Sequence, residues 1–312
     1  MTPYERVQNA LHGKPVDRVP VIFWRHFRPE GSGEKLAELT YEFFVQKFAL
    51  DIVKIMPDLP YPMPSGNFAT AEDIKNLPVF DQNIPLFQEQ LRCVKALRHK
   101  IGPDYPLIIT YFSPLTIMMR WIGKTAAPEV ARKHPEAFLE GLQTIARTLQ
   151  QVFAAVIEAG VSGVFFSCMG ATTAHFTKDE YAVFGKPYDL VALEGAQRGW
   201  LNIAHIHAEP DQFGDKIYFE SFLDYPVSVL SWSDKVTEPS LHQALALTDK
   251  CVMGGLYERG AATTGGADAI KSEIDDAIKQ TGSRRLILAN GCSLPDDVDE
   301  QWLHIIREHA GR

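Results

Sequence analysis

Short apolar segments alternate with longer amphipathic ones along the 312 residues of the chain. Eight of the apolar segments have the length and the Val, Ile and Phe content of strands, at 19–24, 51–57, 107–112, 163–168, 201–207, 227–232, 251–256 and 285–290. A helical period of about 3.6 residues is clearest at 135–160, 241–250, 267–282 and 296–310. Strands that alternate with helices pair in parallel and are buried on both faces. The pattern therefore predicts an α/β fold, a (β/α)8 or TIM barrel with an additional N-terminal helix.

Signals at the ends of the predicted helices agree with this division of the chain. Gly160 and Gly282 follow periodic segments, as glycines do after the last turn of a helix, and Thr177 with Glu180 forms a capping-box pattern. No linker or low-complexity tract divides the sequence, so we expect one domain over 1–312. The proline-rich segment 56–70 is too long for a tight turn, and we expect it to lie over the mouth of the barrel.

Composition narrows the classes of partner. The net charge is −8 and no run is rich in Lys or Arg, which argues against nucleic acid because duplex binding relies on clustered cations. No segment approaches the roughly 20 apolar residues that span a bilayer. The first 18 residues carry both acids and bases, unlike a signal peptide. We therefore expect a cytoplasmic protein that acts on a small-molecule substrate, without a membrane partner.

The most specific chemistry lies at the ends of the fifth and eighth predicted strands. Barrels of this kind concentrate their chemistry at the C-terminal ends of the strands. His205 and His207 are two residues apart and so face the same side of a strand, and Cys292 follows the last strand. Two imidazoles and one thiolate suit zinc and leave one position for substrate or water. Cys168, at the end of the fourth strand, is either a further ligand or a buried small apolar side chain.

Other strand ends carry further candidates, each with a plainer alternative. Arg25 could bind an anion or form an ordinary ion pair, and Asp58 and Asp234 are general-base or histidine-orienting candidates, although solvated loop acids look the same. The glycine-rich segment 262–270 precedes a helix, where it could receive a phosphate or serve only the turn. Four aromatic residues at strand ends are expected to line the substrate pocket unless they belong to the core: Trp24, Tyr111, Trp232 and Tyr257.

Several segments resemble, in chain order, the uroporphyrinogen decarboxylase superfamily, which also contains zinc-dependent corrinoid and coenzyme M methyltransferases. The most specific of them are ERVQNALHGKPVDRVPVIFWR at the start and ILANGCSLPDD at the end. The segments FALDIVKIMPDLPYP, YFSPLTIMMRWIG, IAHIHA and CVMGGL lie between them. The resemblance covers essentially the whole chain, and it implies a (β/α)8 barrel with its site at the C-terminal mouth.

The superfamily resemblance also separates two kinds of chemistry. Members that decarboxylate uroporphyrinogen carry an Arg-Gln-Ala-Gly-Arg motif, which RHFRPEG matches at Arg25 and only loosely at Arg28. The methyltransferase branch uses a His-x-Cys pair after the fifth strand and a later Cys as zinc ligands. His205, His207 and Cys292 occupy these places, with His207 where that branch has Cys. A neutral imidazole in place of a thiolate leaves the zinc more positive and a stronger Lewis acid.

The resemblance to this branch favours a zinc-dependent methyltransferase or demethylase. It implies a small methylated substrate, or a methyl group from a separate corrinoid protein or folate, with zinc activating a thiol or an oxygen. Two alternatives stay open. One is a decarboxylase or lyase of a small carboxylic acid that needs no cofactor and uses Arg25 as its anion anchor. The other is a zinc hydrolase. Homodimers occur among the relatives, so a homodimer is a further expectation.

Overall fold

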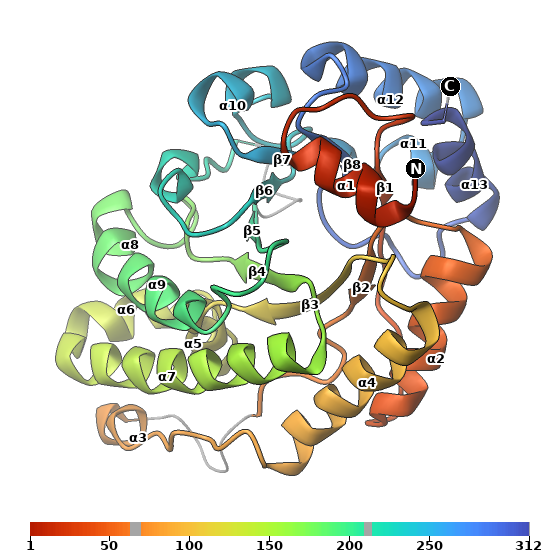
Figure 1. Ribbon diagram of the computed structural model, residues 1–312. Helices are drawn as coiled ribbons and strands as arrows, with labels where there is room; N and C mark the ends of the chain where they lie inside the picture. Colours follow the sequence, from red (N-terminus) through yellow and green to blue (C-terminus); the bar gives the residue numbers. More distant parts are fainter. Residues whose placement is uncertain (63–69, 209–213, 312) are drawn as a thin grey trace.

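The computed structural model describes residues 1–62, 70–208 and 214–311 and forms a barrel of parallel strands surrounded by helices (Figure 1). The strands are β1 (Val21–Ile22), β2 (Val53–Ile55), β3 (Leu107–Phe112), β4 (Gly163–Cys168), β5 (Ile203–Ile206), β6 (Val229–Trp232), β7 (Cys251–Leu256) and β8 (Leu286–Asn290). They form one sheet in the order β1-β8-β7-β6-β5-β4-β3-β2, and all paired neighbours run parallel. The predicted (β/α)8 barrel and its eight strands are confirmed.

Helices lie around the outside of the barrel (Figure 1). They are α1 (Pro3–Leu11), α2 (Gly33–Tyr41), the π-helical η1 (Glu42–Lys47), α3 (Ala71–Lys75), α4 (Pro85–Ile101), α5 (Pro114–Ile122), α6 (Ala126–Lys133), α7 (Pro135–Ala159), α8 (Lys178–Phe184), α9 (Lys186–Glu194), the 3-10 helix η2 (Phe219–Phe222), α10 (Leu241–Leu247), α11 (Ala261–Thr264), α12 (Ala267–Thr281) and α13 (Glu300–His309). The four helices predicted from periodicity correspond to α7, α10, α12 and α13. The N-terminal helix is α1.

The predicted helix ends are also found. Gly160 follows α7 with φ 114° and Gly282 follows α12 with φ 61°, both in the left-handed region that glycine enters without a steric penalty. Thr177 and Glu180 exchange side-chain and backbone hydrogen bonds at the start of α8, which is the capping box expected there. These local signals fix where helices stop and so where the strands can begin.

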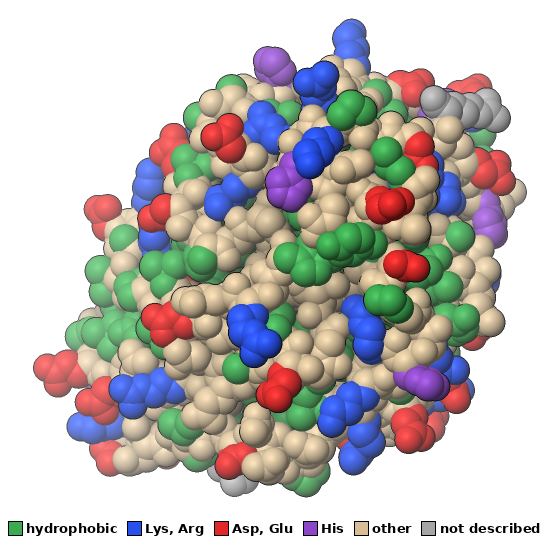
Figure 2. Space-filling model, in the orientation of Figure 1, with side chains coloured by type: hydrophobic (Ala, Val, Ile, Leu, Met, Phe, Trp, Pro, Cys, Tyr) green, Lys and Arg blue, Asp and Glu red, His purple; other side chains and the backbone are tan. Residues whose placement is uncertain are grey.

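Two surface expectations bear on partners. Within the described part of the chain, no helix combines the length and the apolar character needed to cross a membrane. Figure 2 shows Lys and Arg side chains interspersed with Asp and Glu on the face in view. Residues 63–69 of the proline-rich segment lie outside the described residues, so the expected cover over the barrel mouth stays a prediction.

The seam between β1 and β2 is closed by a side chain instead of a strand ladder. The backbone N–H of Asp51 donates to the carbonyl of Val21 (3.0 Å), and the Val21 N–H donates to Asp51 Oδ2 (2.8 Å). The fully buried carboxylate also accepts hydrogen bonds from Arg6 Nη1 (2.6 Å) and from both terminal nitrogens of Arg18 (2.5 and 2.8 Å). Asp51 therefore joins the two ends of the sheet and ties them to α1.

The substitution Asp51→Asn should destabilise the barrel by about 3–5 kcal/mol, because it leaves two guanidinium groups beside a neutral amide in a buried site. Urea unfolding followed by circular dichroism measures the loss. Asp17 also binds Arg6, but its side chain is 41% exposed, so Asp17→Asn is the matched control and should cost much less. An equal loss in the two variants would contradict the role of Asp51 at the seam.

Candidate metal centre

Three residues predicted to bind a metal come together where β5 and β8 end. His205 lies in β5, His207 follows two positions later, and Cys292 stands two residues beyond β8. One ligand atom from each lies within 4.8 Å of the others, and Cys292 Sγ is 3.7 Å from His207 Nδ1. A tetrahedral zinc ion with its usual bond lengths separates a sulfur from a nitrogen ligand by about 3.6 Å. The three donors and their spacing therefore fit zinc.

The backbone around the three residues is held in place by neighbouring strands. The N–H of His207 donates to the carbonyl of Cys168 (2.8 Å), which continues the pairing of β5 with β4 beyond the strand. On the other side, the buried Asn290 side chain donates to the carbonyl of Cys292 and accepts from the N–H of Trp24 (3.3 Å). A Cβ at Gly291 would lie 2.6 Å from the Cα of Ser233, so the turn needs glycine to bring Cys292 this close to β6.

The His205 ring is fixed in a form suited to metal binding. Its Nδ1 lies 3.2 Å from Ser231 Oγ, and the ring stacks on Phe165 at a centroid distance of 5.1 Å. When Ser231 Oγ accepts a hydrogen bond from Nδ1–H, Nε2 keeps its lone pair for a metal. Burial, together with the nearby His207 and Lys54, holds the pKa of His205 well below its usual value. The imidazole is therefore neutral at physiological pH, as a metal ligand must be.

Cys292 and two neighbouring ionisable groups, Glu258 and Lys54, have shifted pKa values. Burial raises the pKa of the Cys292 thiol to about 11, with the nearby Glu258 carboxylate adding to the effect. Burial also raises the pKa of Glu258, and neither of its carboxylate oxygens has a hydrogen-bond partner among the described residues. The pKa of Lys54 is lowered to about 7 because its side chain is fully buried. The centre therefore lies in an interior where charge is costly unless a partner compensates it.

Cys168 is not brought to this group. Ser167 pairs with His205, whereas Cys168 pairs with Ile206, so the Cys168 side chain leaves the opposite face of the sheet. Its Sγ lies 3.7 Å from Asp189 Oδ2 in a buried cluster outside the strands. The structure thus matches the plainer interpretation, in which Cys168 is a buried small side chain.

The three polar residues with expected catalytic roles bind other parts of the protein. Arg25 Nη2 lies 3.4 Å from Glu300 Oε1, which makes it part of an ion pair. Asp58 bonds the ring of His26 (2.6 Å) and the N–H of Phe27 (2.7 Å), so it holds the loop after β1. Asp234, whose pKa burial raises to about 6, accepts from the N–H of Gly255 in β7 (2.7 Å). None of these contacts reaches His205, His207 or Cys292.

The four aromatic candidates are divided between the inside and the outside of the barrel. Trp24 lies in the interior, and the centroid of its ring is 4.4 Å from the Lys54 ammonium nitrogen. The Tyr111 hydroxyl donates to Gln90 in α4 (2.5 Å), and Trp232 donates to the carbonyl of Pro239 (2.8 Å), so both face outward. The remaining candidate, Tyr257, is half-buried beyond β7.

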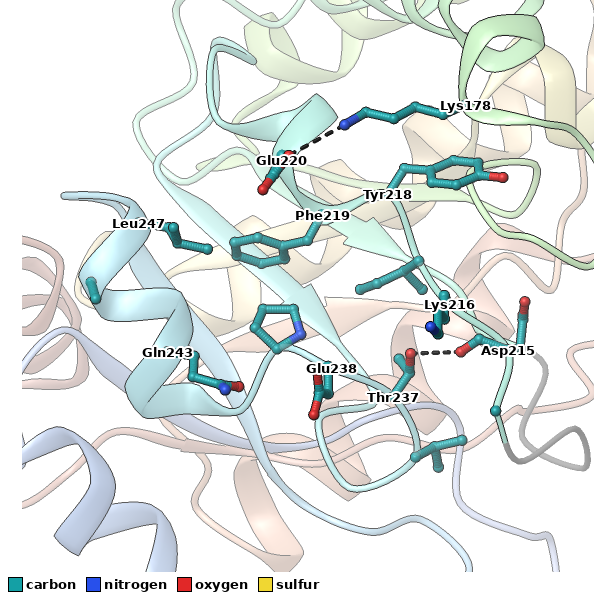
Figure 3. Close-up of a pocket in the computed structure, with 15 residues that line it drawn as sticks. Lys178, Asp215, Lys216, Tyr218, Phe219, Glu220, Thr237, Glu238, Gln243 and Leu247 are labelled. Atoms are coloured by element: carbon teal, nitrogen blue, oxygen red, sulfur yellow. Dashed lines mark hydrogen bonds and ion pairs between the residues drawn. The ribbon is translucent and has the colours of Figure 1, made fainter.

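Two other features do not belong to the centre. Gly265 and Gly266 adopt φ values of 88° and 121° between α11 and α12, which suits the turn interpretation of the glycine-rich segment. A pocket of about 690 Å³ lies beside α10 (Figure 3), where Phe219 and Leu247 form apolar walls and Thr237 donates to the carbonyl of Asp215. This pocket contains none of the three candidate ligands.

The sequence interpretation gave no role to several residues that shape the centre. Lys54 carried a signal, since it is the one charged residue between Ile52 and Met56 in an otherwise apolar strand segment. A lysine there must either leave the sheet or be buried with a purpose. Ser231 carried no comparable signal, because a serine in a strand is common and its partner lies on another strand.

Comparisons with known proteins agree with the barrel fold. The family model described as uroporphyrinogen decarboxylase matches residues 50–311. A methyltransferase from Methanosarcina mazei superposes with a TM-score of 0.77 at 17% identity, covering 99% of this chain and 98% of that one. A B12-independent methionine synthase from Shewanella sp. W3-18-1 gives 0.50 at 16% identity, over 71% of this chain and 64% of that one. No curated protein sequence gives a significant match.

The cluster around Cys168 makes stability depend on pH. Burial raises the pKa of Asp189 from 3.8 to about 7, although Tyr181 and Tyr225 donate to its Oδ2 (2.7 and 2.9 Å). The folded protein then keeps a proton that the unfolded chain releases above about pH 4. The retained proton on Asp189 therefore stabilises the fold fully below pH 4, and this stabilisation is lost as the pH rises to about 7.

The substitution Asp189→Asn removes this titration and keeps an oxygen that can accept from both tyrosines. The free energy of unfolding of the wild type, relative to the variant, should therefore fall between pH 4 and pH 8, by on the order of 4 kcal/mol at most. Urea unfolding of both proteins across this pH range measures the difference. A difference that stays constant with pH would refute the buried titration.

Proposed function

Because the chain belongs to the uroporphyrinogen decarboxylase family, we propose that it is a zinc-dependent methyl-transferring enzyme of that family. The observation that carries the proposal is the meeting of His205, His207 and Cys292 at the C-terminal strand ends, with spacing that fits zinc. His207 and Cys292 are half-buried, so a fourth ligand can approach from solvent. A site with three protein ligands and one open position is typical of catalytic zinc.

Zinc in this place would act as a Lewis acid that lowers the pKa of an acceptor thiol or polarises a methoxy-type oxygen. The protein would supply orientation. Ser231 fixes the His205 ring, Asn290 holds the turn that carries Cys292, and Phe165 supports His205 from one face. We propose a small methylated compound, a folate or a separate corrinoid protein as the methyl donor.

The contacts of Arg25 weaken the case for the rival decarboxylase interpretation. It relied on Arg25 to bind a substrate carboxylate, but this guanidinium pairs with Glu300 and lies over the ring of Phe43 at 5.3 Å. A carboxylate substrate would have to break the ion pair before binding there. The contacts of Arg25 therefore favour the metal centre as the place of chemistry.

Metal analysis tests the ligand assignment. The purified protein should contain stoichiometric zinc, and the variants His207→Ala and Cys292→Ala should each bind it much more weakly, because two ligands are left in place of three. His207→Cys should retain zinc, since a thiolate can replace the imidazole. The exposed His242 gives a matched control in His242→Ala. Zinc that survives the double substitution of His207 and Cys292 by Ala would refute the site.

Activity is tested with methylcobalamin as the methyl donor and a small thiol as the acceptor, by following the loss of the methyl–cobalt absorption. The zinc-loaded protein should accelerate the transfer, and Cys292→Ala should lower the rate by at least about 100-fold, as expected when a Lewis-acid site is lost. Folate and small methylated donors are tested in the same way, with methylated thiol as the product. A product that contains oxygen from labelled solvent would instead identify a hydrolase.

A further inference from the structure

The interior of the barrel holds a lysine that has no acidic partner among the residues that the structure describes. Lys54 is 1% exposed, and its Nζ lies over the rings of Trp24 and Phe165, at 4.4 and 4.1 Å from their centroids. Among the described residues, its one hydrogen-bond acceptor is the weakly accepting Sδ of Met56, at 3.4 Å. No carboxylate of the described residues lies within ion-pair distance of Nζ. A buried ammonium normally has such a partner, because the cost of removing it from water is large.

A second donor without an acceptor lies at the same level of the barrel. Thr110 is 6% exposed, and its Oγ1 has no hydrogen-bond partner among the described residues. Thr110 pairs with Phe165, and Ile109 pairs with Ile55, which places Met56 level with Thr110. Both of these neighbours contact the Lys54 ammonium. The ammonium and the Thr110 hydroxyl therefore face the same part of the interior.

This part of the interior adjoins the metal centre. The Phe165 ring that lies beneath the Lys54 ammonium also stacks on His205. The acids that act on Lys54 from a distance are Asp58, whose oxygens bond His26 and Phe27, and the Cys292 thiol. Glu258, on the Cys292 side, has its pKa raised by burial and forms no ion pair with Lys54. The described residues thus offer two hydrogen-bond donors beside the centre and no anion to receive them.

We propose that Lys54 and Thr110 bind a carboxylate group of the substrate, which accepts one hydrogen bond from the ammonium and one from the hydroxyl. The substrate class is then a small carboxylic acid whose reacting thiol or methyl-bearing atom reaches the neighbouring metal centre. This inference deepens the proposed function. It rests on that function for the statement that the reacting atom of the substrate reaches a metal. It also replaces Arg25, which pairs with Glu300, with a cation that has no acidic partner among the described residues.

Isothermal titration with two matched probes tests the carboxylate site. The zinc-loaded protein is titrated with 3-mercaptopropionate and with 3-mercapto-1-propanol, which differ only in the carboxylate. The wild type should prefer the carboxylate by about tenfold or more, as expected for a charge-assisted hydrogen bond in a buried site. Lys54→Met keeps the apolar stem and should abolish the preference while retaining zinc. Arg25→Met removes a cation from the same end of the barrel and should keep the preference.

Two further measurements separate binding from a structural role. Thr110→Val keeps the shape of the side chain and should weaken the carboxylate probe by about threefold to tenfold. Lys54→Met should unfold at the same or a higher temperature than the wild type, since it removes an unpaired buried charge. A Thr110→Val variant that binds the carboxylate probe as tightly as the wild type would overturn the part that the hydroxyl plays in the proposal.

The remaining outcomes are equally decisive. A wild type that shows no preference, or a preference that survives in Lys54→Met or disappears in Arg25→Met, overturns the carboxylate site. If the protein binds no zinc, the proposed function fails by itself. The carboxylate site is then tested on the metal-free protein with propionate and 1-propanol, where the same order of affinities is expected.

Discussion

The buried carboxylate of Asp51 closes the barrel, and the geometry of the centre depends on that closure. Strand pairing runs from β2 through β8 to β1, and the contact that joins β1 to the start of β2 is the exchange of hydrogen bonds between Asp51 and Val21. In a closed barrel of parallel strands, the C-terminal ends of all the strands stand around one rim. His207 and Cys292, which are 85 positions apart, meet across that rim.

Much of the fold was predictable because parallel strands buried on both faces leave continuous apolar segments. All eight appear in the structure within a few residues of the expected bounds, with the shortest strand, β1, reduced to Val21–Ile22. The sequence also predicted that the side chains of His205 and His207 point to the same face of the strand, since side chains two residues apart in a strand do so. Cys292 could be placed near them because every strand of such a barrel ends at the same rim.

The roles of single side chains could not be read from the sequence, because each depends on a partner from a distant segment. Arg25 is occupied by Glu300, and Asp234 by the backbone of β7. Cys168 shows how little separates the alternatives. A shift of one residue in the pairing of β4 would have turned it inward in place of Ser167. Lys54, by contrast, is unusual already in the sequence, as a charged residue in an apolar strand. A role could be assigned to it only once its neighbours in the barrel were known.

The unequal burial of the four cysteines has a consequence for oxidation. Burial raises the pKa of all four thiols and so lowers their reactivity towards oxidants, but Cys93, Cys168 and Cys251 are also closed off from solvent. Cys292 is half-buried and therefore the thiol that peroxide or a disulfide can reach. The atom most open to oxidative damage is thus also a candidate metal ligand. A bound metal would shield it, so the redox state of the surroundings and metal occupancy would act on the protein through one sulfur.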